Sequence, residues 1–97
     1  MDQEQMVLGG WGAPEEATEE TQIICDKVKT KIEEKTNAKY EVYKLVKFRS
    51  QTVAGRKFRF KLHVGGVNYI HVEVYQNIQG ELRLEKTHVD KTEDDAL

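Results

Sequence analysis

The residues that could carry out chemistry in this 97-residue sequence are few, and they form no catalytic set. The candidates are Cys25, Ser50, His63, His71 and His88. An enzyme site needs a nucleophile with a base, a pair of carboxylates in a pocket, or a cradle for a metal or phosphate. His63 and His71 fall on neighbouring predicted strands, but no third ligand stands at a useful spacing. We therefore expect no catalytic residue, no metal site and no cofactor.

Cys25 is the only cysteine, which excludes an internal disulfide and indicates a reducing compartment. It shares a helical spacing with Val28 and Ile32, where a small thiol is typical of core packing. The first residues, Met1 to Gln5, are polar and acidic and precede no long apolar run. Neither a secretory signal nor a membrane span is predicted, so we expect a cytoplasmic protein without a membrane partner.

A site of contact with another protein is predicted instead, at the pentapeptide Gln51-Thr52-Val53-Ala54-Gly55. This uncharged stretch separates two segments rich in Lys and Arg, and we expect it to form the loop of a hairpin. Gly55 supplies a backbone angle that other residues resist. A loop that faces water is normally polar, yet this one carries Val53 and Ala54. We infer a hairpin tip built to enter a groove.

A second contact element is indicated near the N-terminus, where Val7-Leu8 precedes Gly9-Gly10. The simple interpretation is a flexible tail with incidental hydrophobic residues. Together with an apolar hairpin tip, the same residues favour an extended peptide that enters one groove beside the hairpin. Valine and leucine side chains would fill pockets there, and the glycines would let the two backbones approach closely.

Length and composition limit the protein to one domain, residues 1–97, with a leader at about residues 1–12. With 38% hydrophobic and 33% charged residues, the chain can bury a single modest core. The formal net charge of −2 provides no general attraction to nucleic acid or to acidic membranes.

The elements that position these residues follow from the pattern of apolar side chains. Thr18 reads as a helix cap, and a helix of about five turns is predicted to end at Asn37. Its apolar stripe consists of Ile24, Cys25, Val28 and Ile32. Four strands are expected at roughly 40–50, 56–64, 69–77 and 82–89, followed by an acidic, loose tail from Lys91. One helix on an antiparallel meander of four strands is an α+β fold.

Basic residues alternate with aromatic residues in two of these strands, at 44–49 and 56–61, which invites a nucleic-acid interpretation. A sheet that stacks bases presents its aromatic side chains outward. Here Phe58 and Phe60 share a phase with Leu62 and Val64, so we assign them to the core. The Lys and Arg residues of the other phase are expected to be solvated charges, and no nucleic-acid partner is predicted.

Taken together, these residues resemble a stefin, a type 1 cystatin that inhibits cysteine peptidases. The family's Gln-x-Val-x-Gly motif is complete in Gln51, Val53 and Gly55, and its N-terminal glycine corresponds to Gly9. The resemblance continues through the helix, Leu45-Val46-Lys47-Phe48, His63-Val64-Gly65 and Ile70-His71-Val72, and ends in Val89-Asp90-Lys91 and Asp94-Asp95. It covers roughly residues 6–97.

The resemblance implies a cystatin-like fold, in which one helix packs on a curved antiparallel sheet of about four long strands and a short N-terminal strand. It implies reversible, tight-binding, competitive inhibition of papain-like cysteine peptidases such as cathepsins. The implied contact residues come from the leader, from the first hairpin and from the second hairpin. They are Val7, Leu8, Gly9 and Gly10, then Gln51, Thr52, Val53, Ala54 and Gly55, and finally Ile78 and Gln79.

Three questions remain open from the sequence: the function, the oligomeric state and the role of Trp11. The alternative function is a binding or assembly module on the same frame that inhibits nothing, and we expect a monomer with a domain-swapped dimer as the alternative. Trp11 is unusual for a stefin leader, and packing against the sheet is favoured over a role as an extra anchor.

Overall fold

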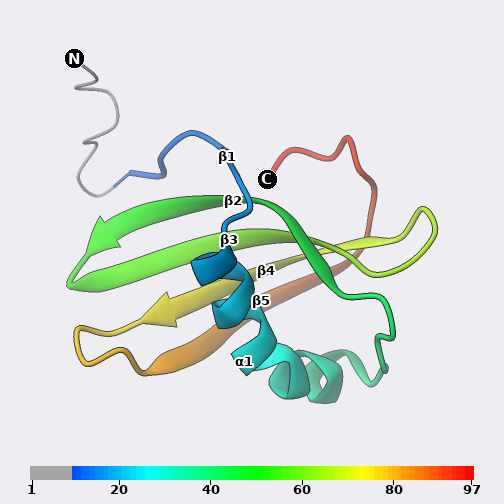
Figure 1. The fold of residues 1–97 in the computed structure, drawn as a ribbon, viewed down its shortest axis with the longest axis horizontal. Helices are drawn as coiled ribbons and strands as arrows, with labels where there is room; N and C mark the ends of the chain where they lie inside the picture. Colours follow the sequence, from blue (N-terminus) through cyan, green and yellow to red (C-terminus); the bar gives the residue numbers. More distant parts are fainter. Residues whose placement is uncertain (1–9) are drawn as a thin grey trace.

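The computed structural model describes residues 10–97, in which one helix packs against a five-stranded antiparallel sheet (Figure 1). The strands follow one another across the sheet in chain order, β1-β2-β3-β4-β5. The predicted α+β fold is therefore confirmed, including its short N-terminal strand. The elements are β1 (Glu15–Glu16), α1 (Glu19–Thr36), β2 (Lys44–Val53), β3 (Gly55–His63), β4 (Tyr69–Gln76) and β5 (Leu82–Lys91).

Helix α1 begins and ends where its sequence signals predict. The Thr18 hydroxyl accepts a hydrogen bond from the Thr21 amide at 3.1 Å, and the Thr21 hydroxyl accepts one from the Thr18 amide at 3.0 Å. This reciprocal capping satisfies two amides that would otherwise lack partners at the first turn. Asn37 stops the helix in a left-handed conformation with φ 55°.

The core lies between α1 and one face of the sheet, which we call the inner face. Ile24, Cys25, Val28 and Ile32 of the helix are buried, as predicted. Phe58 and Phe60 are also buried, and their ring centroids lie 5.2 Å apart. Burial raises the pKa of the Cys25 thiol well above its usual range, because the low-dielectric core disfavours a thiolate. Cys25 is therefore an inert packing residue.

The first hairpin is tighter than the sequence predicted. Gln51, Thr52 and Val53 belong to β2 and pair with β3, with Val53 directly opposite Gly55. The expected pentapeptide loop was wrong in its extent, since only Ala54 lies outside the two strands. The reason is the backbone of Gly55, whose φ of +101° lets the chain reverse within one residue while the strand pairing continues to the tip.

The opposite face of the sheet, the outer face, is covered by the end of the chain. The Lys61 ammonium donates hydrogen bonds to the backbone oxygens of Glu93 and Asp95, at 2.5 and 2.6 Å. Arg49 donates to the Leu97 backbone oxygen at 3.0 Å. The prediction of a loose tail was therefore wrong, because backbone carbonyls of the tail provide acceptors for basic side chains of the sheet.

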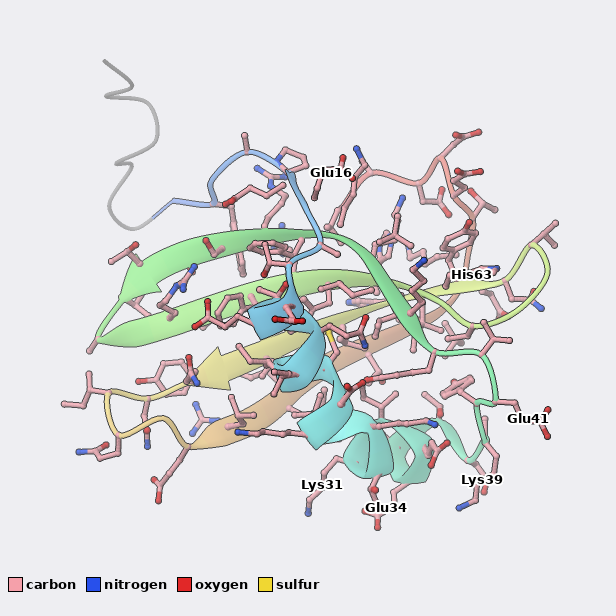
Figure 2. All side chains as sticks on the ribbon, in the orientation of Figure 1. Glu16, Lys31, Glu34, Lys39, Glu41 and His63 are labelled. Carbon is pink, nitrogen blue, oxygen red and sulfur yellow. The ribbon has the colours of Figure 1, made fainter. Side chains whose placement is uncertain are left out.

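The outer face also differs from the solvated surface that was predicted from the alternation of basic and aromatic residues in the strands. Lys61, His71 and Glu73 are buried on it, and Arg59 is half-buried. By contrast, charged residues of α1 such as Lys31 and Glu34 point away from the sheet (Figure 2). Within residues 10–97, no helix is long and apolar enough to span a membrane.

Candidate functional site

Three parts of the chain that were predicted to make contacts converge on one end of the sheet. Figure 1 shows the β2–β3 tip and the β4–β5 tip at the same end, away from the β3–β4 turn. The Gly12 amide donates to the Ser50 carbonyl at 2.8 Å, and Arg49 Nε donates to the Gly12 carbonyl at 2.6 Å. Because β1 runs antiparallel to β2, with Glu15 opposite Phe48, the chain from Glu15 back to Gly10 heads toward the β2–β3 tip.

The leader is only partly placed by this geometry. Gly10 is described and half-buried. The other predicted contact residues of the leader, Val7, Leu8 and Gly9, lie outside the described residues. The structure therefore shows where the root of the leader is attached, through Gly12, and leaves those three assignments as predictions.

The first tip presents uncharged side chains to solvent. Thr52, Val53 and Ala54 are all exposed, and Val53 keeps 39% of its surface accessible. The neighbouring Gly55 packs so closely against β4 that a Cβ atom there would lie 2.2 Å from the Gln76 carbonyl oxygen. Glycine is therefore required at this position for two reasons, its positive φ and the close approach of two backbones.

The second tip is held by hydrogen bonds within its own turn. The Asn77 side-chain oxygen accepts hydrogen bonds from the amides of Gln79 and Glu81, at 3.0 and 2.8 Å, and so forms a local turn. The Gly80 amide donates to the Asn77 carbonyl at 2.9 Å. Ile78 projects from this turn with 78% of its surface exposed. Ile78 therefore presents an apolar side chain at the same end of the sheet as the first tip.

One residue of this end escaped the sequence analysis. The Tyr75 hydroxyl, near the end of β4, donates a hydrogen bond to the Ala54 carbonyl at the first tip. The Arg83 guanidinium lies over the Tyr75 ring, 5.1 Å from its centroid. The available signal was only a tyrosine near a strand end, and the sequence does not indicate which loop such a hydroxyl reaches.

Comparisons with known proteins identify the family. The chain matches the cystatin domain over residues 9–94. It is 46% identical to leukocyte cysteine proteinase inhibitor 1 of Sus scrofa over 100 aligned positions, which cover 100% of this chain and 97% of that protein. It is 43% identical to cystatin-A of Mus musculus and 40% identical to cystatin-B of Homo sapiens, each over 95% of this chain and 97% of the relative. The chain belongs to the cystatin family.

The relatives are stefin-type cystatins, so the resemblance inferred from the motif is confirmed. Cystatins are protease inhibitors and not enzymes. The residues that this cystatin places at one end of its sheet are those of the Gln-x-Val-x-Gly hairpin and of the second hairpin, Gln51 to Gly55 and Ile78 to Gly80.

Trp11 of this cystatin packs against the outer face. The Arg59 guanidinium lies 4.2 Å from the centroid of the indole, within the range of a cation–π contact. Arg59 is itself held by Glu73, with 3.0 Å between Arg59 Nε and the Glu73 carboxylate. The packing role predicted for Trp11 is confirmed by this contact.

His63 is separated from the other two histidines in the fold. His63 pairs with Tyr69 near the β3–β4 turn, at the end opposite the tips (Figure 2), whereas His71 pairs with Lys61 and with His88. His71 was expected on an open face, but the tail covers it and its Nε2 has no hydrogen-bond partner. Burial lowers the pKa of His71 to about 4, and the charges of Lys61 and Lys91 contribute. Among residues 10–97, no three metal-ligating side chains come together.

Proposed function

We propose that this cystatin is a reversible, tight-binding, competitive inhibitor of papain-like cysteine peptidases of the cathepsin type. The observation that carries the proposal is the convergence of two exposed apolar tips and the root of the leader on one end of a rigid sheet. On binding, the proposed contact residues would act together as one wedge. They are Val7, Leu8, Gly9 and Gly10 of the leader, Gln51 to Gly55 of the first tip, and Ile78 and Gln79 of the second tip.

The wedge would inhibit by occluding the active-site cleft. The first tip lies in the middle, so it would cross the cleft beside the catalytic cysteine, with the leader and the second tip on either side. Burying Val53 or Leu8 in a pocket contributes roughly 1.5–3 kcal/mol to binding, before the entropic cost of ordering the chain is subtracted. The leader loses conformational freedom on binding, so its net contribution is smaller than that of the preformed tips.

The tip is also suited to resist cleavage. Val53 and Gly55 stay paired across the hairpin, so the backbone around Ala54 is held in a tight reversal and not in the extended form of a substrate strand. The absence of charge from Gln51 to Gly55 favours desolvation against a peptidase surface. The name of the Sus scrofa relative, a cysteine proteinase inhibitor, supports the same target class.

We further propose that one domain, residues 1–97 with a leader at about 1–12, acts as a monomer in the cytoplasm. Support for the monomer comes from the first tip, because β2 and β3 of the same chain form it. The single buried thiol of Cys25 is compatible with the reducing cytoplasm. Elution at the mass of one chain on size-exclusion chromatography is expected, and a dimer would contradict this part of the proposal.

Titration of papain with the purified protein tests the inhibitory function. We expect stoichiometric loss of activity, and full papain activity at equimolar, micromolar protein would overturn the proposal. Gly9→Arg and Val53→Asp should each weaken binding strongly, because each places charge where the wedge must enter an apolar or narrow site.

A matched control is available at the other end of the sheet. Val67, in the β3–β4 turn, is 82% exposed, and Val67→Asp makes the same chemical change far from the tips. We expect Val67→Asp to inhibit papain as the unchanged protein does. Equal effects of Val53→Asp and Val67→Asp would show that the tip is not the contact site.

A further inference from the structure

The tip of the first hairpin contains one residue that the strand pairing leaves out. Ala54 lies between Val53 and Gly55, which face each other across the hairpin. Its carbonyl oxygen receives a hydrogen bond from the Tyr75 hydroxyl, which belongs to β4 and lies 21 positions away in the sequence. The one unpaired residue at the centre of the wedge is thus held from the neighbouring strand.

Tyr75 is in turn held from both sides. It pairs with Lys57 of β3 and with Arg83 of β5, and the Arg83 guanidinium lies over its ring. Two Arg83 nitrogens contact one Glu85 oxygen at 3.1 and 2.7 Å. The other Glu85 oxygen lies 3.5 Å from the Lys57 ammonium. We call Tyr75, Arg83, Glu85 and Lys57 the tip brace, since they link β3, β4 and β5 beneath the first tip.

The carboxylate of the brace is charged at neutral pH. Hydrogen bonding from Arg83 lowers the pKa of Glu85, and the positive charge of Lys57 lowers it as well. Arg83 therefore keeps an ionised partner over the working range of the protein. Glu85 thus pairs with the same guanidinium that lies over the Tyr75 ring.

Backbone packing at Gly55 shows that the tip rests on β4 beside this brace. A Cβ atom at Gly55 would lie 3.1 Å from the Tyr75 hydroxyl oxygen and 2.2 Å from the Gln76 carbonyl oxygen. Two contacts, one between backbones and one through the Tyr75 hydroxyl, thus fix the tip relative to β4. Because β4 leads into the second hairpin, the same contacts fix the two tips relative to each other.

We propose that Tyr75 is a positioning residue that holds the first tip in its inhibitory conformation and couples it to the second tip. The inference rests on the proposed function. A tip that is already ordered loses less conformational freedom when it enters the cleft, so affinity rises without a new contact to the peptidase. The effect is expected in the dissociation constant, and not in the folding stability of the domain.

Tyr75→Phe tests the inference because it removes the hydroxyl and keeps the ring under Arg83. Ordering the backbone of one freed tip residue on binding corresponds to a rise of roughly five- to tenfold in the dissociation constant for papain. The melting temperature should stay near that of the unchanged protein. Tyr69→Phe is the matched control, since it removes a hydroxyl from the other end of the same strand and should leave the affinity unchanged.

Arg83→Gln distinguishes positioning from a direct contact of Tyr75 with the peptidase. Alone, we expect it to raise the dissociation constant about two- to threefold, because the ring of Tyr75 loses its restraint. In the Tyr75→Phe background it should add almost nothing, since the hydroxyl it positions is gone. Additive effects of the two changes would overturn the positioning role.

A measurement on the free protein keeps this inference separate from the proposed function. In ¹⁵N-labelled Tyr75→Phe, amide exchange and relaxation at Ala54 and Gly55 should show a more mobile tip than in the unchanged protein and in Tyr69→Phe. Unchanged tip dynamics would overturn the brace even if papain is inhibited. A mobile tip in a protein that does not inhibit papain would confirm the brace and overturn the function.

Discussion

Both faces of the sheet contain buried residues, but opposite chemistry buries them. Phe60 and Lys61 are neighbours on β3, with 0% and 6% of their surfaces exposed, and they point to the inner and outer face respectively. Phe60 needs only apolar neighbours, which α1 and the sheet provide. Lys61 needs acceptor atoms in place, and the backbone oxygens of Glu93 and Asp95 supply them. Inner-face burial depends on shape, whereas outer-face burial depends on specific partners.

The faces also differ in what they position. The inner face joins α1 to the sheet and so holds the domain together. On the outer face, Arg49 binds the Gly12 carbonyl and the Leu97 backbone oxygen, and Arg59 stacks on Trp11. The polar face therefore ties the root of the leader and the tail to the sheet. We expect the largest loss of stability from inner-face changes, smaller losses from outer-face changes, and an effect on how the leader is presented from changes at Arg49.

Phe60→Ala should have the largest effect on stability, and it tests how much the inner face contributes to that stability. Truncating a fully buried phenylalanine is expected to lower the free energy of unfolding by about 3–5 kcal/mol, because it removes apolar contacts and leaves a cavity. Urea denaturation followed by circular dichroism measures the change. A loss below about 1 kcal/mol would mean that the core closes around the missing ring.

Acidification should lower the stability of the protein, because His71 is buried on the outer face in its neutral form. Its folded pKa of about 4 lies below the unfolded value of 6.5, so folding favours the neutral imidazole. The contribution of His71 is complete above pH 6.5 and is lost as the pH falls toward 4, by up to about 3 kcal/mol in the free energy of unfolding. The groups that face it are Lys61, Lys91 and His88, which oppose protonation, and Asp95, which favours it.

The measurement compares the protein with His71→Gln, which cannot titrate, by urea denaturation from pH 7 to pH 4. The difference between the two unfolding free energies should shrink or reverse as the pH falls. A difference independent of pH would show that the tail opens readily and lets water reach His71 in the folded protein.

Lys61→Met should lower stability by about 1–3 kcal/mol, less than Phe60→Ala. It keeps the length of the side chain and removes the ammonium, so the carbonyls of Glu93 and Asp95 lose their donor. Faster amide exchange or proteolysis confined to residues 92–97 would confirm that the tail is released. An increase in stability would show that the buried charge is a net destabilising feature of the outer face.

Arg49→Gln should have the smallest effect on stability, about 1 kcal/mol, but a measurable effect on inhibition. It removes the hydrogen bonds from Arg49 to the Gly12 carbonyl and to the Leu97 backbone oxygen, so the root of the leader and the end of the tail are both less well fixed. We expect the dissociation constant for papain to rise a few-fold. Lys44→Gln, at the exposed start of the same strand, is the control. Unchanged affinity in Arg49→Gln would restrict the outer face to a structural role.

Most of the inner face and the positions of the contact elements could be predicted from the sequence. The spacing of Ile24, Val28 and Ile32 predicts a helical stripe, and the alternation at Phe58 and Phe60 predicts an inward-facing strand, because each depends only on local periodicity. The first hairpin was placed correctly from Gly55 and its flanking residues. Its true length depended on how far the pairing with β3 extends, which no local pattern contains.

The outer face could not be predicted, for a physical reason. The tail binds Lys61 through its backbone oxygens, and these are present in every residue whatever its type. The side chains of the tail are acidic, so their pattern favours solvent. Tyr75 illustrates the same limit at the tip, because its partner is also a backbone carbonyl in a distant part of the chain.

By itself, the sequence determined the fold class, the family and the residues of the two tips, because periodicity and a motif with a fixed spacing are properties of neighbouring residues. Only the tertiary structure decided that the tail covers the outer face, that His71 is buried without a partner and that Tyr75 supports Ala54. Each of these depends on a contact across strands or with the end of the chain, where position in space and not residue type selects the partner.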